Sequence, residues 1–347
     1  MQDKRETFII SRTDKIGDVV LTLPMAGILK SHFPNCHIIF LGQKYTKNVI
    51  SLSQSVDEFW DWEEVSQESV TTEIKERFKE VKTTFLHVFP QKKIAQWAKK
   101  VGFQNRVGTS RRLYHFLTCN QKIKLSRKKS DLHESQLNSL LLVKTIENYS
   151  APSLENMKEF YTFPTQSNFT NKSEYIDSNK INIILHPKSF GSAREWPTES
   201  FLQLALMLTK TNKYRVLISG TVKEEADILS VFETYFSSEI VNMVNKLSLS
   251  QFIDTIQQAD ALVAASTGPL HIASALGKKT VGIYPPIVPM HKERWGPVGK
   301  YAEALDSGKR DCSRCTKGGL CACMGEVSVE SVFDRLEGHF NKYPKAP

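Results

Sequence analysis

The stretch AASTGPLHIASALGKKTVGIYPP, residues Ala264 to Pro286, decides the fold. The apolar residues that lead into it predict a buried strand, and Thr267-Gly268-Pro269 begins an alanine-rich helix. Gly277 is typical of a helix C-cap, and a second apolar strand runs from Thr280 to Tyr284. Strand, turn, helix and strand in this order predict a βαβ unit within a parallel sheet.

The start of this helix is suited to binding an anion. Its first N–H groups have no partner inside the helix, Thr267 adds a hydroxyl donor, and Gly268 lets a phosphate approach the backbone closely. His271 follows one turn later, on the face that carries Gly268. The alternative is a helix start that only caps itself. A second glycine turn, at Gly17, favours a binding site.

Length and composition indicate a globular chain of two domains. The 347 residues are 40% hydrophobic and 24% charged. The formal charge of +9 favours an anionic partner, but the basic residues lack the interleaved aromatic residues and reading helix of a nucleic-acid binder. No run of 18 apolar residues is present, and the start MQDKRETFIIS has no signal-peptide core. We therefore expect a cytoplasmic protein.

Strands and helices alternate along the chain, which predicts doubly wound α/β domains. In the first half, strands are predicted at residues 7–11, 37–41, 56–60 and 83–88, and helices at 19–32, 43–53, 67–80, 91–100 and 132–149. The very basic segment 106–129 is predicted to be irregular. Residues 163–179 are rich in Ser, Thr and Asn and indicate a linker. In the second half, strands are predicted at 181–185 and 214–219, and helices at 198–208, 222–236, 249–258 and 327–340.

Four stretches together resemble the signature motifs of the glycosyltransferase family 9 heptosyltransferases. They are SRTDKIGDVVLTLP (11–24), HPKSFGSAREWPTESF (186–201), SGTVKEEADIL (219–229) and ASTGPLHIASALG (265–277). Their order and spacing match, and the Cys323-Met324 pair near the end is similar too. The resemblance covers nearly the whole chain.

The resemblance implies a GT-B fold, in which two Rossmann-like domains face a central cleft. The acceptor-binding domain is expected at residues 1–165 and the nucleotide-sugar domain at 180–325. Residues 326–347 are expected to form a C-terminal helix that crosses back to the first domain. The implied reaction is an inverting, metal-independent transfer of heptose from ADP-L-glycero-D-manno-heptose to the Kdo or heptose of the lipopolysaccharide inner core. The enzyme is then expected to work at the inner face of the inner membrane, with no cofactor beyond its donor.

The expected catalytic base is Asp18, which matches the family's aspartate and follows Gly17 where a loop meets a helix. Asp14 is the fallback, and a plain helix cap is the alternative for Asp18. Arg12 matches a basic family position near the acceptor. Arg111 and Arg112 in the basic segment, and His133 after it, are the other expected acceptor contacts; most lysines of that segment are interpreted as solvated.

The expected donor site lies in the second domain. Lys188 and Arg194 flank a Ser/Gly turn and can stabilise the departing diphosphate. The remaining donor contacts are expected at the helix start and after the preceding strands: Glu224, Glu225, Leu247, Ser266, Thr267, Gly268 and His271. Either glutamate can accept from ribose hydroxyls or be an ordinary helix residue. Trp196 is interpreted as packing. Ser266 stands where many family members have aspartate, so another sugar remains open as the donor.

Four cysteines, Cys312, Cys315, Cys321 and Cys323, have the CxxC and CxC spacing of a zinc knuckle. The short loop and the awkward CxC pair favour a reduced, packed cluster over zinc, and no metal is expected in catalysis.

Three other function classes stay open: a GT-B transferase using a different nucleotide sugar, a nucleotide-sugar epimerase, and a non-catalytic protein that binds nucleotide sugar or lipid core. A pure binder has no need of Asp18, which weighs against the last.

Overall fold

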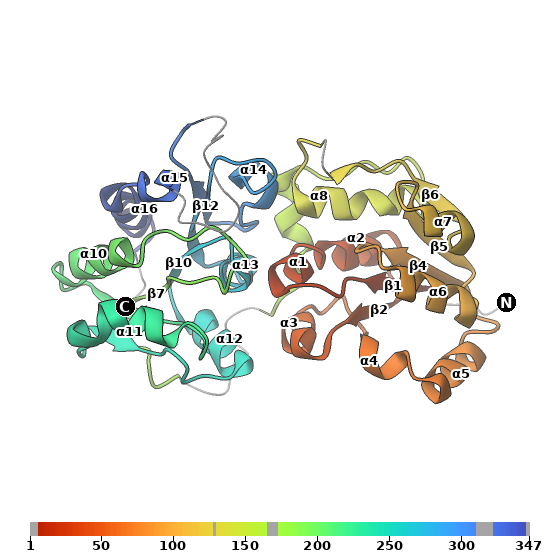
Figure 1. Ribbon diagram of the computed structural model, residues 1–347, viewed down its shortest axis with the longest axis horizontal. Helices are drawn as coiled ribbons and strands as arrows, with labels where there is room; N and C mark the ends of the chain where they lie inside the picture. The colour runs from red at the N-terminus through yellow and green to blue at the C-terminus, as the bar shows by residue number, and fades with distance from the viewer. Residues whose placement is uncertain (1–5, 128–129, 165–172, 310–321, 345–347) are drawn as a thin grey trace. The chain divides into compact units, whose positions relative to one another are not determined.

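The computed structural model describes residues 6–127, 130–164, 173–309 and 322–344. The chain divides into two compact units, Met1–Pro164 and Thr165–Pro347. Each unit contains a six-stranded sheet with helices packed on it (Figure 1), and every strand pair is parallel. The predicted pair of Rossmann-like α/β sheets is confirmed.

The first sheet has the strand order β3-β2-β1-β4-β5-β6. Its strands are β1 (Thr7–Ser11), β2 (His37–Gly42), β3 (Glu58–Asp61), β4 (Thr83–His87), β5 (Asn105–Thr109) and β6 (Gln121–Ile123). Ile9 of β1 pairs with Ile39 and Phe85 on its two sides, and all three side chains are fully buried. The strand order reverses direction at β1, so the edge beyond its carboxyl end is where ligands bind in sheets of this kind.

The helices of the first unit are shorter and more divided than the hydrophobic pattern predicts. They are α1 (Ile16–Val20), α2 (Pro24–His32), α3 (Lys47–Ile50), α4 (Trp62–Val65), α5 (Glu68–Arg77), α6 (Lys92–Val101), α7 (Leu113–Thr118), α8 (Glu134–Ser139) and α9 (Leu154–Met157). Pro24 occupies the first turn of α2, where its missing N–H costs nothing, so the predicted helix 19–32 is interrupted before it.

The prediction of an irregular segment at 106–129 is wrong for the residues that the structure describes. Strand β5, helix α7 and strand β6 lie there, and both strands extend the sheet. Arg106 of β5 pairs with Phe85 of β4, and its guanidinium donates a hydrogen bond to the carbonyl of Thr118 at 2.8 Å. Short strands with polar side chains, such as β5 and the edge strand β6, lack the apolar run on which the prediction relied.

The second sheet has the order β12-β11-β10-β7-β8-β9. Its strands are β7 (Ile181–His186), β8 (Tyr214–Ile218), β9 (Ile240–Asn242), β10 (Ala261–Ala265), β11 (Lys279–Ile283) and β12 (Ala302–Leu305). The helices are α10 (Thr198–Thr209), α11 (Glu225–Phe232), α12 (Leu249–Gln258), α13 (Gly268–Ala275), α14 (Lys292–Trp295), α15 (Ala322–Gly325) and α16 (Val329–Lys342). The βαβ unit expected around residues 264–286 is β10-α13-β11, and Gly277 after α13 has φ +75°, as its predicted capping position requires.

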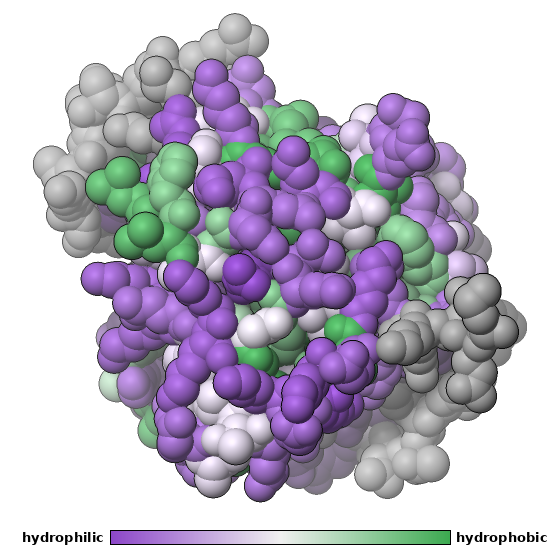
Figure 2. Space-filling model, turned by 90° about the vertical axis from the view of Figure 1, so that its right-hand side faces the viewer, coloured by the Kyte–Doolittle hydropathy of each residue, from purple (hydrophilic) through white to green (hydrophobic). Residues whose placement is uncertain are grey.

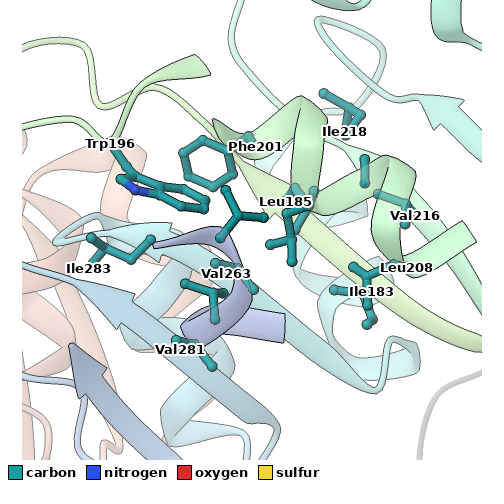
Figure 3. Packing of buried hydrophobic residues seen from close by; sticks show 14 of the residues in the cluster. Ile183, Leu185, Trp196, Phe201, Leu208, Val216, Ile218, Val263, Val281 and Ile283 are labelled. Atoms are coloured by element: carbon teal, nitrogen blue, oxygen red, sulfur yellow. The ribbon is translucent and has the colours of Figure 1, made fainter. Parts of the chain in front are cut away.

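The core of the second unit is formed by this sheet together with helices α10, α11 and α16. Alternate residues of neighbouring strands, among them Leu185, Val216 and Val263, point to one face and meet α10 (Figure 3). Trp196 is fully buried against Phe201, and its indole N–H donates to the carbonyl of Val327 at 2.9 Å, which confirms the packing role predicted for it.

Helix α16 completes this core. Ser328 caps its first turn, and Val332 and Leu336 are fully buried in the hydrophobic cluster of the second unit. The helix packs on α10 and β11. The return of the C-terminal residues to the first domain stays a prediction, as do the domain boundaries.

Candidate active site

The loop after β1 carries the predicted base. Because β1 is buried between β2 and β4, the residues that follow it emerge at the carboxyl edge of the sheet. Asp18 lies in the first turn of α1, where a carboxylate is stabilised by the helix dipole. Its side chain is 19% exposed, so it is shielded from bulk water but still reachable. The N-cap position of α1 is occupied by Lys15, so Asp18 is not the residue that caps this helix.

Arg12 organises the acids at this edge. Its side chain is only 4% exposed, and its guanidinium is paired with Asp14 at 2.7 Å, with Asp18, and with Glu134 at 3.1 Å. Burial alone would lower the pKa of Arg12, but the three carboxylates raise it above its ordinary value. Arg12 therefore stays charged and holds Asp18 in place.

Glu134 and Asn138 on α8 complete the cluster. Glu134, with its side chain 2% exposed, accepts from Arg12 and also from Arg127. Asn138 Oδ1 accepts from Arg12 at 3.3 Å and from Arg127 at 2.9 Å. Its amide in turn donates to the hydroxyl of Thr22 at 3.0 Å. Two arginines and three carboxylates thus form one network, which we call the Arg12 cluster.

Sequence reasoning missed Glu134, Asn138 and the specific position of Arg127. The available signal was the i, i+4 spacing of an acid and an amide on one helix directly after a basic segment. Nothing in the sequence pairs that helix with residue 12, because the two are joined only in the folded unit.

Burial changes the proton affinity of the two acids beside Arg12. It raises the pKa of Asp14 to about 6, against the opposing charge of Arg12. Burial also raises the pKa of Asp18, with Arg12 opposing and the charge of Glu134 adding to the rise. A carboxylate with a raised pKa is a better proton acceptor, which is what general-base catalysis requires.

The other predicted acceptor residues differ in their exposure to solvent. Arg111 and Arg112 are exposed in the turn between β5 and α7. His133, by contrast, is 1% exposed and caps α8, its Nδ1 accepting from the backbone N–H of Ser135. His133 thus caps the helix that carries Glu134, and its expected contact with the acceptor stays a prediction.

In the second unit, Lys188 follows the carboxyl end of β7. Its ammonium lies 3.1 Å from a Glu195 oxygen and 3.4 Å from an Asp227 oxygen. Burial would lower the pKa of Lys188, but Glu195 and Asp227 raise it above its ordinary value. Glu195 also accepts from the backbone and hydroxyl of Ser189, both at 2.8 Å, so it orders the turn. Arg194 precedes it and is half-buried.

The start of α13 has the features predicted for an anion site. Thr267 is the N-cap residue, but its side chain makes no capping bond. The Thr267 hydroxyl oxygen is buried without a hydrogen-bond partner in the part of the chain that is described. Buried hydroxyls are ordinarily satisfied, so this one is available to a ligand. Gly268 and the half-buried Ser266 flank it, and His271 is buried one turn on.

The remaining donor candidates differ in their surroundings. Glu224 is 4% exposed and accepts from the backbone and hydroxyl of Thr221 at 2.8 and 2.9 Å. Its carboxylate is therefore engaged in shaping the turn after β8. Glu225 is half-buried and accepts from Asn245 at 3.0 Å, while Leu247 is half-buried before α12. Of the two glutamates, Glu225 has the more accessible carboxylate.

Cys312, Cys315 and Cys321 lie outside the described residues; Cys323 is buried at 6% exposure next to Met324. Within the described residues no group of three or more His, Cys, Asp or Glu side chains is arranged to hold a metal ion. Across the same parts of the chain, no helix is both long and apolar enough to cross a membrane.

Comparison with known proteins places these features in a family. A family model described as glycosyltransferase family 9 (heptosyltransferase) matches residues 95–321. The chain is 22% identical to lipooligosaccharide heptosyltransferase 2 of Campylobacter jejuni over 331 residues, which is 93% of this chain and 95% of that protein.

Two solved structures share the fold. One, described as the structure of the Escherichia coli ADP-heptose lipopolysaccharide heptosyltransferase II, superposes with a TM-score of 0.73 at 17% identity, covering 98% of this chain and all of that one. The other, the E. coli heptosyltransferase WaaC with ADP, gives 0.68 at 16% identity over 96% of this chain and 99% of that one.

Proposed function

The chain belongs to glycosyltransferase family 9, the heptosyltransferase family, and from that premise we propose that it transfers heptose from ADP-heptose to the inner core of lipopolysaccharide. The support is the family match, together with relatives of nearly equal length that are named as heptosyltransferases. In the transfer, the bond between the anomeric carbon and the diphosphate breaks, and the acceptor oxygen forms the new glycosidic bond.

The second unit is proposed to bind the donor. The N–H groups at the start of α13 and the unpartnered hydroxyl of Thr267 suit a diphosphate. Lys188 and Arg194 supply positive charge for the oxygen that leaves with ADP. With these donors the reaction needs no metal, so transfer is expected to continue in the presence of EDTA. Glu225 and Leu247 are the proposed contacts to the nucleoside.

The first unit is proposed to bind the acceptor and to supply the base. Asp18 takes the proton of the acceptor hydroxyl as that oxygen attacks, and Arg12 holds the carboxylate in position. The single observation that carries this role is the buried pairing of Arg12 with Asp18 at the carboxyl end of β1. Asp14, which Arg12 also holds, is the fallback. Arg111 and Arg112 are proposed to meet the anionic groups of the acceptor.

The acceptor is a membrane lipid, so the enzyme is proposed to act in the cytoplasm at the inner face of the inner membrane. Its place there as a peripheral protein agrees with the formal charge of +9.

The donor proposal is tested by incubating the purified protein with a Kdo-bearing lipid A acceptor and one nucleotide sugar at a time. ADP-heptose is expected to yield an acceptor one heptose heavier by mass spectrometry, together with released ADP. Transfer from ADP-glucose or GDP-mannose but not from ADP-heptose would contradict the proposed donor and favour the alternative that Ser266 leaves open. No transfer from any nucleotide sugar, either to this acceptor or to one that already bears a heptose on its Kdo, would contradict the proposed reaction.

A further inference from the structure

Helix α7 turns its apolar side chains to solvent. Leu113, Phe116 and Leu117 are 86, 56 and 76% exposed, and their i, i+3, i+4 spacing places them in one stripe. The opposite face, which packs on the unit, carries the polar residues His115 and Thr118 at 0 and 5% exposure. A surface helix ordinarily buries its apolar stripe. The stripe of α7 is therefore oriented outward.

The protein holds α7 in this orientation. The backbone N–H of Thr109 donates to His115 Nδ1 at 3.0 Å. A Cβ added at Gly108 would lie 2.5 Å from the same ring nitrogen, so the strand and the buried histidine are in close contact. At the end of the helix, Lys99 Nζ donates to the carbonyl of Leu117 at 2.9 Å. Rolling the stripe inward would break these contacts.

The stretch of sequence that contains the stripe is basic. Residues 104–130 contain no Asp or Glu, but eight Lys and Arg residues: Arg106, Arg111, Arg112, Lys122, Lys124, Arg127, Lys128 and Lys129. Arg111 and Arg112 are exposed immediately before α7, and the Lys122 ammonium lies 5.5 Å from the centre of the Phe116 ring. Figure 2 views the side of the molecule on which α7 lies in Figure 1, and shows hydrophobic surface bordered by hydrophilic side chains.

We propose that α7 docks on the surface of a bilayer that contains anionic lipid. Leu113, Phe116 and Leu117 enter the boundary between headgroups and acyl chains, while Arg111 and Arg112 lie among the phosphates. Charge complementarity favours a bilayer over a protein, because a protein partner would have to be acidic all around an apolar centre. This inference rests on the proposed function in that it assigns to α7 the contact of a peripheral protein with the membrane; the transfer step itself needs only a donor and an acceptor hydroxyl.

The test is sedimentation of the full chain with vesicles of phosphatidylcholine, alone or mixed with phosphatidylglycerol. The wild type is expected to bind the anionic vesicles and to be released by added salt. The double variant Leu113→Ser/Leu117→Ser is expected to bind them about tenfold more weakly or worse, since two exposed leucine side chains are lost. The matched control is Val143→Ser/Leu154→Ser, whose residues are 39 and 40% exposed in the same unit; it should bind like the wild type.

Equal vesicle binding by the two double variants would overturn the proposal. Absence of binding between the wild type and the anionic vesicles would also overturn it. If α7 instead docked on a protein, the wild type would not sediment with the vesicles, so that outcome also contradicts the proposal. Transfer to a soluble, delipidated core oligosaccharide separates docking from catalysis. The Leu113→Ser/Leu117→Ser variant is expected to keep that activity and its melting temperature. Failure of the wild type in this soluble assay would count against the proposed reaction and not against the docking surface.

Discussion

Arg12 and Glu134 are separated by 122 residues and form a buried ion pair, with 3.1 Å between Arg12 Nη1 and a Glu134 oxygen. The pair joins the loop after β1 to the start of α8. Since Arg12 also contacts Asp18, the position of the proposed base depends on a residue far away in the chain. The same glutamate accepts from Arg127, so it links both arginines of the cluster.

Replacing this glutamate should affect stability and catalysis separately. Glu134→Gln leaves two arginines with one fewer counter-charge in a buried site, and the free energy of unfolding is expected to fall by about 3 kcal/mol. The charge of Glu134 contributes to the raised pKa of Asp18, so the acid limb of the pH–rate profile should move to lower pH. Denaturant unfolding and the pH profile measure the two effects. Glu64→Gln, at an exposed position on α4, is the control. If Glu134→Gln had the same free energy of unfolding and the same pH–rate profile as this control, the role of the ion pair would be contradicted.

The raised pKa of Asp14 predicts a pH-dependent stability. Its pKa is about 6 in the folded state and near 3.8 when unfolded, so between these values the folded state binds the extra proton. This carboxyl therefore reduces the free energy of unfolding as the pH rises from about 4 to about 6. Asp14→Asn removes the contribution, and the stability of the variant relative to wild type should rise over that interval. The control is Asp131→Asn, which makes the same substitution at an exposed site. A constant difference for Asp14→Asn would contradict the raised pKa.

Thr267 is expected to contribute a hydrogen bond to the donor diphosphate. Thr267→Val keeps the shape but removes the buried, unpartnered hydroxyl, and the dissociation constant for ADP should rise about 5- to 10-fold. Thr280→Val is the matched control, because the hydroxyl of Thr280 is also buried without a partner in the described residues, but within β11. Calorimetric titration with ADP distinguishes them. Equal affinities for the two variants would mean that the diphosphate does not meet Thr267.

Arg194 is expected to stabilise the leaving diphosphate. Arg194→Ala should weaken ADP-sugar binding and slow transfer by roughly 10- to 1000-fold, the range for removing one charged stabiliser of a leaving group. Steady-state rates of ADP release measure the effect, and Lys210→Ala, which removes an exposed charge at the end of α10, controls for net charge. Unchanged donor affinity and turnover in Arg194→Ala would remove this residue from the donor site.

The sequence predicted the parts of the fold that rest on local apolar patterns. β1 has an apolar centre and β10 is a continuous apolar run, and Gly268 and Gly277 mark the two ends of α13, so these elements were found. The edge strands β6, β9 and β12, and β5 next to β6, were missed because they are short or partly polar. The basic composition of segment 106–129 likewise did not predict that β5 and β6 extend the sheet.

The site was predicted only where single residues carry the chemistry. Asp18 and Arg12 were identified through their motif, and the structure brings them together. Glu134 could not be inferred, because its pairing with Arg12 depends on the packing of α8 within the folded unit. The role of His133 as the cap of α8, with a buried ring, was likewise not predicted. Burial of a polar ring is a tertiary property that the adjacent residues do not reveal.

The role of Asp18 as the base is the central claim, and Asp18→Asn tests it most directly. Asparagine keeps the size of the side chain and can still accept a hydrogen bond from Arg12, but it cannot take up the proton of the acceptor. The measurement is the rate of heptose transfer at saturating donor and acceptor, with ADP affinity determined on the same preparation. The account predicts unchanged ADP binding and a turnover lower by at least about 100-fold. Transfer at a near wild-type rate by Asp18→Asn would contradict it and would make Asp14 the next residue to replace.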